Sequence, residues 1–260
     1  MTAVKGFRTE INFRDLGGYT AIDGRAVRNG LLYRSSAPGL MNEEELNLLR
    51  DMNIHTMMDF RSRKRCEELP DPELEGCERI QMCAAFESLS DDLNGSFTEF
   101  FRMLADEDQQ GNMTASWVAS IHASLVYSNE AYYEMFRRLL RNETPLLLHC
   151  TQGKDRTGIA AMLILLLLGV DEETILDDFE LTNKYRKSLI KEQMSNFRIL
   201  SRLSKNIRTF LWVKEGVCRS FAAYALTTIQ KRYPSYEDFF RTEYDLSEAD
   251  IAKIRDMYLE

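Results

Sequence analysis

The chain has 260 residues, of which 44% are hydrophobic and 28% are charged, and its formal net charge is −8 at pH 7. This length and composition are typical of a globular protein with one sizeable core, and they exclude collagen-like, low-complexity and solenoid chains. The negative charge argues against general nucleic-acid binding, so we expect no nucleic acid among the partners.

The cysteines and the apolar segments give expectations about compartment and cofactors. Five cysteines are an odd number with no framework spacing, which is typical of a reducing cytoplasm. The longest apolar run, residues 159–168, is too short to span a bilayer and predicts a buried helix instead of a transmembrane segment. The adjacent pair His149-Cys150 lacks metal-ligand spacing, so we expect neither a metal nor another cofactor.

Short strand patterns alternate with helical patterns in the first half, which predicts an α/β fold. One helix should begin after Asn42, a favoured N-cap residue that three glutamates follow. Further helix starts are expected at Asp171, Ser235 and Ser247. The other expected elements are strands at 31–34, 54–60 and 78–83, a basic turn at 61–65, a mostly helical stretch at 84–128 with a break near 106–112, and an amphipathic helix at 129–141.

A strand, a tight loop and a helix start follow one another from Pro145 onward. The apolar residues 146–148 suit a strand that is buried on both faces of a parallel sheet. The loop then runs from His149 to Gly158 and enters the apolar helix. Loop amides and a helix N-terminus both favour negative charge, so this junction predicts a binding site for an anion.

The loop contains the groups that a cysteine needs in order to accept a phosphoryl group. A helix N-terminus with nearby cations lowers a cysteine pKa to about 3.5–7.5, which makes Cys150 the expected nucleophile. Arg156, six residues later, offers a planar guanidinium to clamp phosphate oxygens, and the Thr157 hydroxyl can stabilise the departing thiolate. The expected phosphate-binding residues are Thr151, Gln152, Gly153, Lys154, Asp155 and Arg156, with Gly153 permitting the curvature of the loop.

Two other readings of the loop stay open. One is a catalytically silent module that only binds phosphorylated partners, and the other is a rhodanese-like sulfur transferase, which also uses a loop cysteine. The spacing of Cys150 and Arg156 favours a phosphatase, because none of the other four cysteines is followed by arginine at that offset.

The loop resembles that of the bacterial tyrosine-phosphatase family typified by the PtpB- and LipA-like enzymes. Residues 12–19, 32–35 and 59–62 match further segments of the family pattern, and the resemblance covers nearly the whole chain. It is weakest in residues 84–128 and 183–215. The resemblance implies one phosphatase domain over 1–260, with a central, mostly parallel sheet flanked by helices and a helical C-terminal part.

The resemblance also implies roles for individual residues. Cys150 becomes the nucleophile, Arg156 the phosphate clamp and Asp155 the general acid. Lys154 would supply an extra cation for a polyanionic substrate, and Asp59 would hold Arg156 in position, although a strand-end aspartate can also simply cap the next turn. We expect His149 to tune Cys150 by hydrogen bonding. His55 and His122 are interpreted as structural, and Arg14 and Asp15 as a buried pair that holds the N-terminal turn.

The expected reaction is hydrolysis of a phosphomonoester through a phosphocysteine, with inorganic phosphate as the product. Protein phosphotyrosine is the first substrate to consider, and a phosphoinositide or inositol phosphate is the alternative.

Residues 183–215 carry nine basic and two acidic side chains, so this segment is +7 and the remainder is −15. The segment is either a solvated helix face or a basic helical lid or rim over the anion site.

Overall fold

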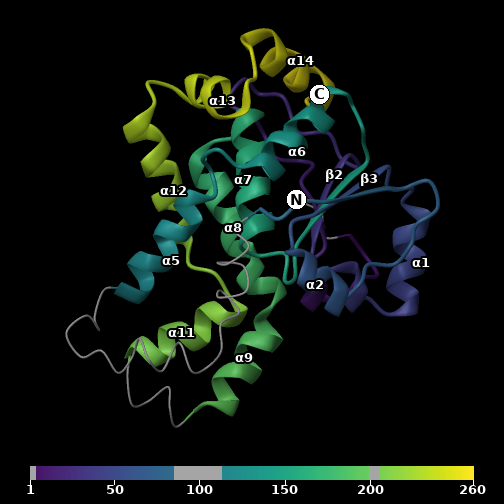
Figure 1. The fold of residues 1–260 in the computed structure, drawn as a ribbon, viewed down its shortest axis with the longest axis vertical. Helices are drawn as coiled ribbons and strands as arrows, with labels where there is room; N and C mark the ends of the chain where they lie inside the picture. The colour runs from purple at the N-terminus through teal and green to yellow at the C-terminus, as the bar shows by residue number, and fades with distance from the viewer. Residues whose placement is uncertain (1–3, 85–112, 199–204) are drawn as a thin grey trace.

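Helices flank both faces of a central sheet, as Figure 1 shows. The structure is a computed structural model, and it describes residues 4–84, 113–198 and 205–260. The expected α/β fold with a mostly parallel sheet is therefore confirmed. No helix among the described residues is long and apolar enough to cross a membrane.

The sheet has five strands in the order β1-β2-β5-β3-β4. Their bounds are β1 (Arg14–Asp15), β2 (Leu32–Ser35), β3 (Thr56–Asp59), β4 (Glu78–Gln81) and β5 (Leu146–His149). Strand β1 pairs antiparallel with β2, whereas β5 lies between β2 and β3 and is parallel to both. The carboxyl ends of β2, β5 and β3 therefore meet at one edge of the sheet, where the loop after β5 begins.

Both faces of the central strand are buried. Leu146 and Leu148 belong to the larger hydrophobic core, and Leu147 belongs to a smaller one on the opposite face. Because successive side chains of a strand point to opposite faces, this continuous apolar run fits a strand with helices on both sides.

The helices lie mostly in the second half of the chain. Their bounds are η1 (Thr9–Ile11), η2 (Pro38–Leu40), α1 (Glu43–Asp51), α2 (Arg63–Glu68), α5 (Met113–Ser124), α6 (Glu130–Leu140), α7 (Arg156–Leu167), α8 (Glu172–Tyr185), α9 (Lys187–Asn196), α11 (Lys205–Glu215), α12 (Arg219–Arg232), α13 (Tyr236–Tyr244) and α14 (Glu248–Tyr258). Every residue of α7 is buried, so this helix forms the centre of the larger core.

Side-chain caps begin several helices at the positions that the sequence predicts. Asn42 and Glu45 form a capping box at the start of α1, and Ser247 and Asp250 form another at α14. The Asp171 carboxylate accepts a hydrogen bond from the Thr174 amide at the start of α8. The expected basic turn at 61–65 differs, because α2 already begins at Arg63.

The basic segment 183–215 includes α9 and α11. Residues 199–204 lie outside the described part of the chain, as do residues 85–112, which include the expected break near 106–112. Helices α9 and α11 lie together at the lower end of the molecule in Figure 1, beyond α8.

Candidate active site

The loop after β5 joins a buried strand to a buried helix. Cys150 follows the last residue of β5, and Arg156 is the first residue of α7. Their exposed fractions are 3% and 8%. The predicted strand, loop and helix start are thus confirmed, and the first turn of α7 directs its amides and its positive dipole end toward the loop.

The surroundings of Cys150 favour its charged form. Burial by itself raises the pKa of a thiol, but the charge of Arg156 and the nearby hydroxyl and amide of Thr157 outweigh burial. The pKa of Cys150 is therefore lower than that of an ordinary cysteine, even with the opposing charge of Asp155 nearby. Such a thiol is a reactive nucleophile near neutral pH.

The backbone of the loop is shaped to receive an anion. Gly153 has φ +64°, and a Cβ atom there would lie 2.2 Å from the Ser35 carbonyl oxygen at the end of β2. The Gly153 carbonyl accepts hydrogen bonds from Asn12 Nδ2 at 3.0 Å and from Arg34 Nη2 at 2.9 Å. The amides of residues 151–155 have no acceptor among the described residues, so they remain available to phosphate oxygens.

A buried cluster of two arginines and one aspartate supports the loop from behind. The Asp178 carboxylate on α8 accepts hydrogen bonds from Arg14 Nε at 3.0 Å and from Arg34 Nη1 at 2.7 Å. All three side chains are buried. The cluster carries one net positive charge directly behind Gly153. Burial and the like charge of Arg14 lower the pKa of Arg34 to about 10.

Arg14 and Asp15 do not form the pair that the sequence suggested. Arg14 donates a hydrogen bond to Asp178, whereas the Asp15 carboxylate accepts hydrogen bonds from the amides of Gly17 at 2.8 Å and Gly30 at 2.7 Å. Neighbouring residues of β1 point to opposite faces, which separates the two side chains. Asp178 was missed because it is one of several acidic residues on α8, and no motif distinguishes it from the others.

Asp59 holds Arg61 and makes no ion pair with Arg156. Its carboxylate accepts hydrogen bonds from Arg61 Nε at 2.8 Å and from Arg61 Nη2 at 2.7 Å, and both side chains are fully buried. Arg156 Nη1 instead donates to the Phe60 carbonyl at 3.0 Å. The end of β3 therefore does position Arg156, but it does so through the main chain, because Arg61 is close enough in sequence to occupy Asp59.

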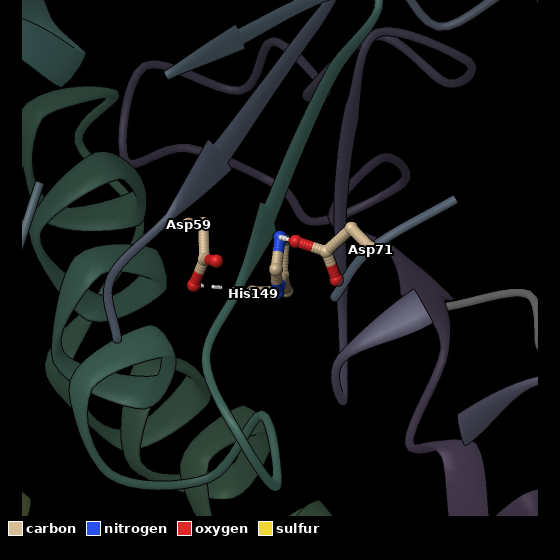
Figure 2. A group of neighbouring side chains, drawn as sticks. All are labelled: Asp59, Asp71 and His149. Atoms are coloured by element: carbon tan, nitrogen blue, oxygen red, sulfur yellow. Dashed lines mark ion pairs between the residues drawn. The ribbon is translucent and has the colours of Figure 1, made fainter. Parts of the chain in front are cut away.

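His149 lies on the opposite side of the strand from Cys150. Figure 2 shows its ring between two carboxylates, with Nδ1 3.8 Å from Asp59 and Nε2 3.4 Å from Asp71. Neither ring nitrogen has a hydrogen-bond partner among the described residues, so the expected hydrogen bond from His149 to Cys150 is not formed. Strand alternation explains the difference.

Asp59, Asp71 and His149 are close enough to one another to be considered as metal ligands. The Arg61 guanidinium, however, contacts the carboxylates of both aspartates at 2.7 Å. A metal ion would have to displace this buried cation, so the cluster fits a metal poorly. The four side chains form a buried charge cluster behind the catalytic loop, in which both His149 ring nitrogens and Asp71 Oδ1 have no hydrogen-bond partner among the described residues.

Two loop side chains reach the end of α11. Lys154 Nζ donates to the Val213 carbonyl at 2.8 Å and lies 3.3 Å from the Gly216 carbonyl, and Gln152 Nε2 donates to Glu215 at 3.1 Å. Lys154 is therefore directed toward the helix end and is not free as an extra phosphate ligand in this state. Carbonyls at a helix C-terminus attract cations, which explains the position of Lys154.

Asp155 contacts a lysine and a histidine. Its Oδ2 atom lies 2.8 Å from Lys154 Nζ, and its Oδ1 atom lies 3.0 Å from Nε2 of His122 on α5. Burial alone would raise the pKa of Asp155, but the charge of Lys154 and the hydrogen bond from His122 hold it well below the ordinary value. The sequence did not indicate this neighbour of His122, whose ring contacts the expected general acid.

Comparison with known proteins places the chain in a family. The model of the tyrosine phosphatase family matches residues 6–260. A Cupriavidus necator protein named as a tyrosine-protein phosphatase is 28% identical, covering 97% of this chain and 87% of that protein. The triple specificity protein phosphatase PtpB of Mycobacterium tuberculosis is 27% identical, covering 95% of this chain and 96% of that protein.

Among solved structures, the chain matches the core catalytic domain of the PP-IP phosphatase SIW14 of S. cerevisiae. The match has a TM-score of 0.32 and 13% identity, and it covers 65% of this chain and 75% of that chain.

Proposed function

The chain belongs to the tyrosine phosphatase family and is a cysteine-dependent phosphoric monoester hydrolase, and we propose that it acts through a phosphocysteine formed on Cys150. The observation that carries this proposal is the setting of the Cys150 sulfur. The thiol has a lowered pKa beside Arg156, and the amides of residues 151–155 that follow it have no acceptor among the described residues. These groups suit both an ionised sulfur and a bound phosphate.

The proposed reaction has two steps. The Cys150 thiolate attacks phosphorus in line with the ester oxygen, the P–O bond breaks, and the leaving oxygen takes a proton from Asp155. Water then attacks the phosphocysteine and gives a proton to Asp155, and the S–P electron pair returns to sulfur as inorganic phosphate forms. Arg156 and the loop amides hold the equatorial oxygens throughout.

Protein phosphotyrosine is the substrate that we propose first. A phosphoinositide is the second candidate, and the exposed lysines Lys184, Lys187 and Lys191 favour it because they lie in the basic segment 183–215. We propose that this segment borders the substrate site as a rim, since its end at Glu215 contacts Gln152 of the loop. Comparing turnover of a phosphotyrosine peptide and a phosphoinositide at equal concentration separates the two candidates.

We also propose a compartment for the chain. All five cysteines are free in the structure, and a reactive thiol at position 150 is protected from oxidation in a reducing compartment. We therefore keep a cytoplasmic location as the proposal.

Replacing the nucleophile tests the mechanism. Cys150→Ser should abolish turnover of p-nitrophenyl phosphate while the loop still binds vanadate, because only the sulfur is removed. Cys77→Ser is the matched control, since this cysteine lies outside the catalytic loop, packs against the smaller hydrophobic core and contacts the Glu78 carbonyl, and it should leave turnover unchanged.

Each alternative reading has its own outcome. Appreciable turnover by Cys150→Ser would contradict the phosphocysteine. A wild-type chain that binds vanadate without hydrolysing any phosphomonoester would indicate a silent binding module. Thiosulfate turnover without phosphatase activity would indicate a sulfur transferase.

A further inference from the structure

His122 reaches the catalytic loop from a distant element. It lies on α5, 33 residues before Asp155, and its Nε2 atom is 3.0 Å from Asp155 Oδ1. The His122 side chain is 4% exposed, whereas that of Asp155 is 34% exposed. Asp155 therefore faces the solvent side of the loop, and His122 contacts it from the protein interior.

The partner of the other ring nitrogen fixes the hydrogen-bond roles of His122. Its Nδ1 atom lies 2.8 Å from the Val118 carbonyl oxygen, which can only accept a hydrogen bond. Nδ1 therefore carries a hydrogen whether the ring is charged or neutral. It follows that Nε2 carries a hydrogen only when the ring is charged, and accepts a hydrogen bond when the ring is neutral.

One mobile proton consequently belongs to the pair of His122 and Asp155. It resides either on Nε2, with a carboxylate opposite, or on Asp155, with a neutral imidazole opposite. The hydrogen bond between the two side chains persists in both forms, so the proton can pass from one to the other without movement of either group.

Aromatic neighbours hold the His122 ring in place. The ring stacks on Phe221 of α12 with 5.2 Å between centroids, and it meets Phe179 of α8 edge-on at 6.1 Å. These contacts come from two helices of the larger core. A side chain that is locked by packing on rigid elements suits a precisely placed catalytic partner.

Asp155 needs such a partner if it is to act as an acid. Lys154 and His122 keep its carboxyl ionised in the resting protein, with a pKa well below the ordinary value. An ionised carboxylate has no proton to give to a leaving oxygen. The proton must therefore come from a neighbour, and a charged His122 ring can supply it across the 3.0 Å contact between its Nε2 atom and Asp155 Oδ1.

We propose that His122 stores the proton that Asp155 delivers to the leaving oxygen, an inference that rests on the phosphocysteine mechanism proposed above. In the first step the P–O bond breaks, and the mobile proton passes from Nε2 through the Asp155 carboxyl to the leaving oxygen. In the second step the attacking water loses a proton to Asp155, and the pair regains the proton that it gave. His122 acts through Asp155 and is a positioning and proton-storing residue.

His122→Gln separates proton storage from simple support. Glutamine can donate a hydrogen bond to Asp155, but it holds no mobile proton. The variant should lose about 100-fold or more in kcat/KM with phenyl phosphate, whose leaving oxygen needs protonation, in line with the usual contribution of general acids. With p-nitrophenyl phosphate, whose leaving group departs without help, the loss should stay below about 10-fold.

Two further variants complete the test. Asp155→Asn should show the same dependence on the leaving group, and the double variant should be no worse than Asp155→Asn alone, because both residues serve one proton. His55→Gln is the matched control, since the exposed His55 side chain has its one hydrogen-bond contact among the described residues with Thr56, and the variant should match the wild type with both substrates.

The possible results are distinct. Three results would overturn the role of His122. His122→Gln could lose kcat/KM equally with both substrates, or it could keep full activity with phenyl phosphate. The third result is a double variant in which the losses of the two single variants multiply. Retained vanadate-sensitive turnover of p-nitrophenyl phosphate by His122→Gln would leave the phosphocysteine mechanism intact in every one of these cases. Failure of the wild type to turn over either substrate would instead end the proposed function.

A measurement on the wild type covers the case in which the variant does not fold. The chain has three histidines, so nitrogen NMR can assign the ring of each one. At the pH of maximal activity, both nitrogens of His122 should be protonated in the resting protein. A His122 ring with an unprotonated nitrogen at that pH would overturn the proposal.

Discussion

Asp178 is the side chain whose removal should cost the most stability behind the loop. It compensates Arg14 and Arg34, and all three are buried. Asp178→Asn leaves two guanidinium groups in the interior without a counter-charge. Breaking a buried ion pair in this way costs about 3–5 kcal/mol, so we expect the free energy of unfolding in urea to fall by about that amount near neutral pH.

The pH dependence of stability gives an independent check of the same cluster. Burial opposes the charge of Asp178, but Arg14 and Arg34 lower its pKa in the folded state. Its contribution is thus fully present above the unfolded pKa of about 3.9 and is lost as the pH falls further. The difference between wild type and Asp178→Asn should shrink in acid.

Asp171→Asn, on the same helix, is the control for this prediction. Asparagine caps a helix as well as aspartate does, so stability should change little. Equal stability of Asp178→Asn and the wild type near neutral pH would contradict the account of the cluster.

The catalytic loop depends on one glycine whose side-chain space is filled by another strand. Gly153→Ala would place a Cβ atom 2.2 Å from the Ser35 carbonyl oxygen, and the backbone there already has positive φ. The loop must shift away from β2, so vanadate binding and turnover should both be lost. Tryptophan or tyrosine fluorescence with increasing vanadate would measure the binding.

Gly24→Ala separates the effect of backbone strain from that of crowding. Gly24 also has positive φ, but a Cβ atom there would meet nothing within 4 Å. This variant should lose about 1 kcal/mol of stability and keep its kcat/KM. Vanadate affinity of Gly153→Ala equal to that of the wild type would show that the loop does not need its close contact with β2.

Local patterns were sufficient to predict the elements that form the site. The apolar run 146–148 predicted β5, and Asn42 and Asp171 predicted helix starts. The spacing of Cys150 and Arg156 predicted the loop. Each of these features depends on neighbours within a few residues, and sequence patterns report such neighbours directly.

The partners of the loop residues were not predictable in the same way. His122 is 33 residues from Asp155, and Arg34 is 144 residues from Asp178. Whether such side chains meet depends on how helices pack across the sheet. Lys154 shows the same limit, because its contacts with Val213 and Gly216 arise only when α11 lies beside the loop.

The charge of the whole molecule is unevenly distributed around this site. Residues 183–215 are strongly basic in an otherwise acidic chain. Part of this charge is neutralised, because Arg186 is buried and pairs with Glu215. The exposed lysines on α8 and α9 remain, and a locally positive region on an acidic protein attracts anions and speeds their encounter.

The five cysteines of the chain differ in their surroundings, and this contrast isolates the nucleophile. Burial raises the pKa of Cys66 to about 12, helped by a hydrogen bond to Asp59, and burial also raises the pKa of Cys77 and Cys218. The pKa of Cys150 is lowered. Near neutral pH, thiolate should therefore form mainly at position 150.

The most direct test is the ultraviolet absorbance of thiolate, titrated in the wild type and in Cys150→Ser. Subtracting the two curves removes the other four cysteines and leaves Cys150 alone. We predict that the difference titrates with a pKa clearly below about 8.5, the ordinary value for cysteine. A difference curve that titrates at or above that value would show a protonated thiol, and it would contradict the proposal that Cys150 attacks phosphorus as a thiolate.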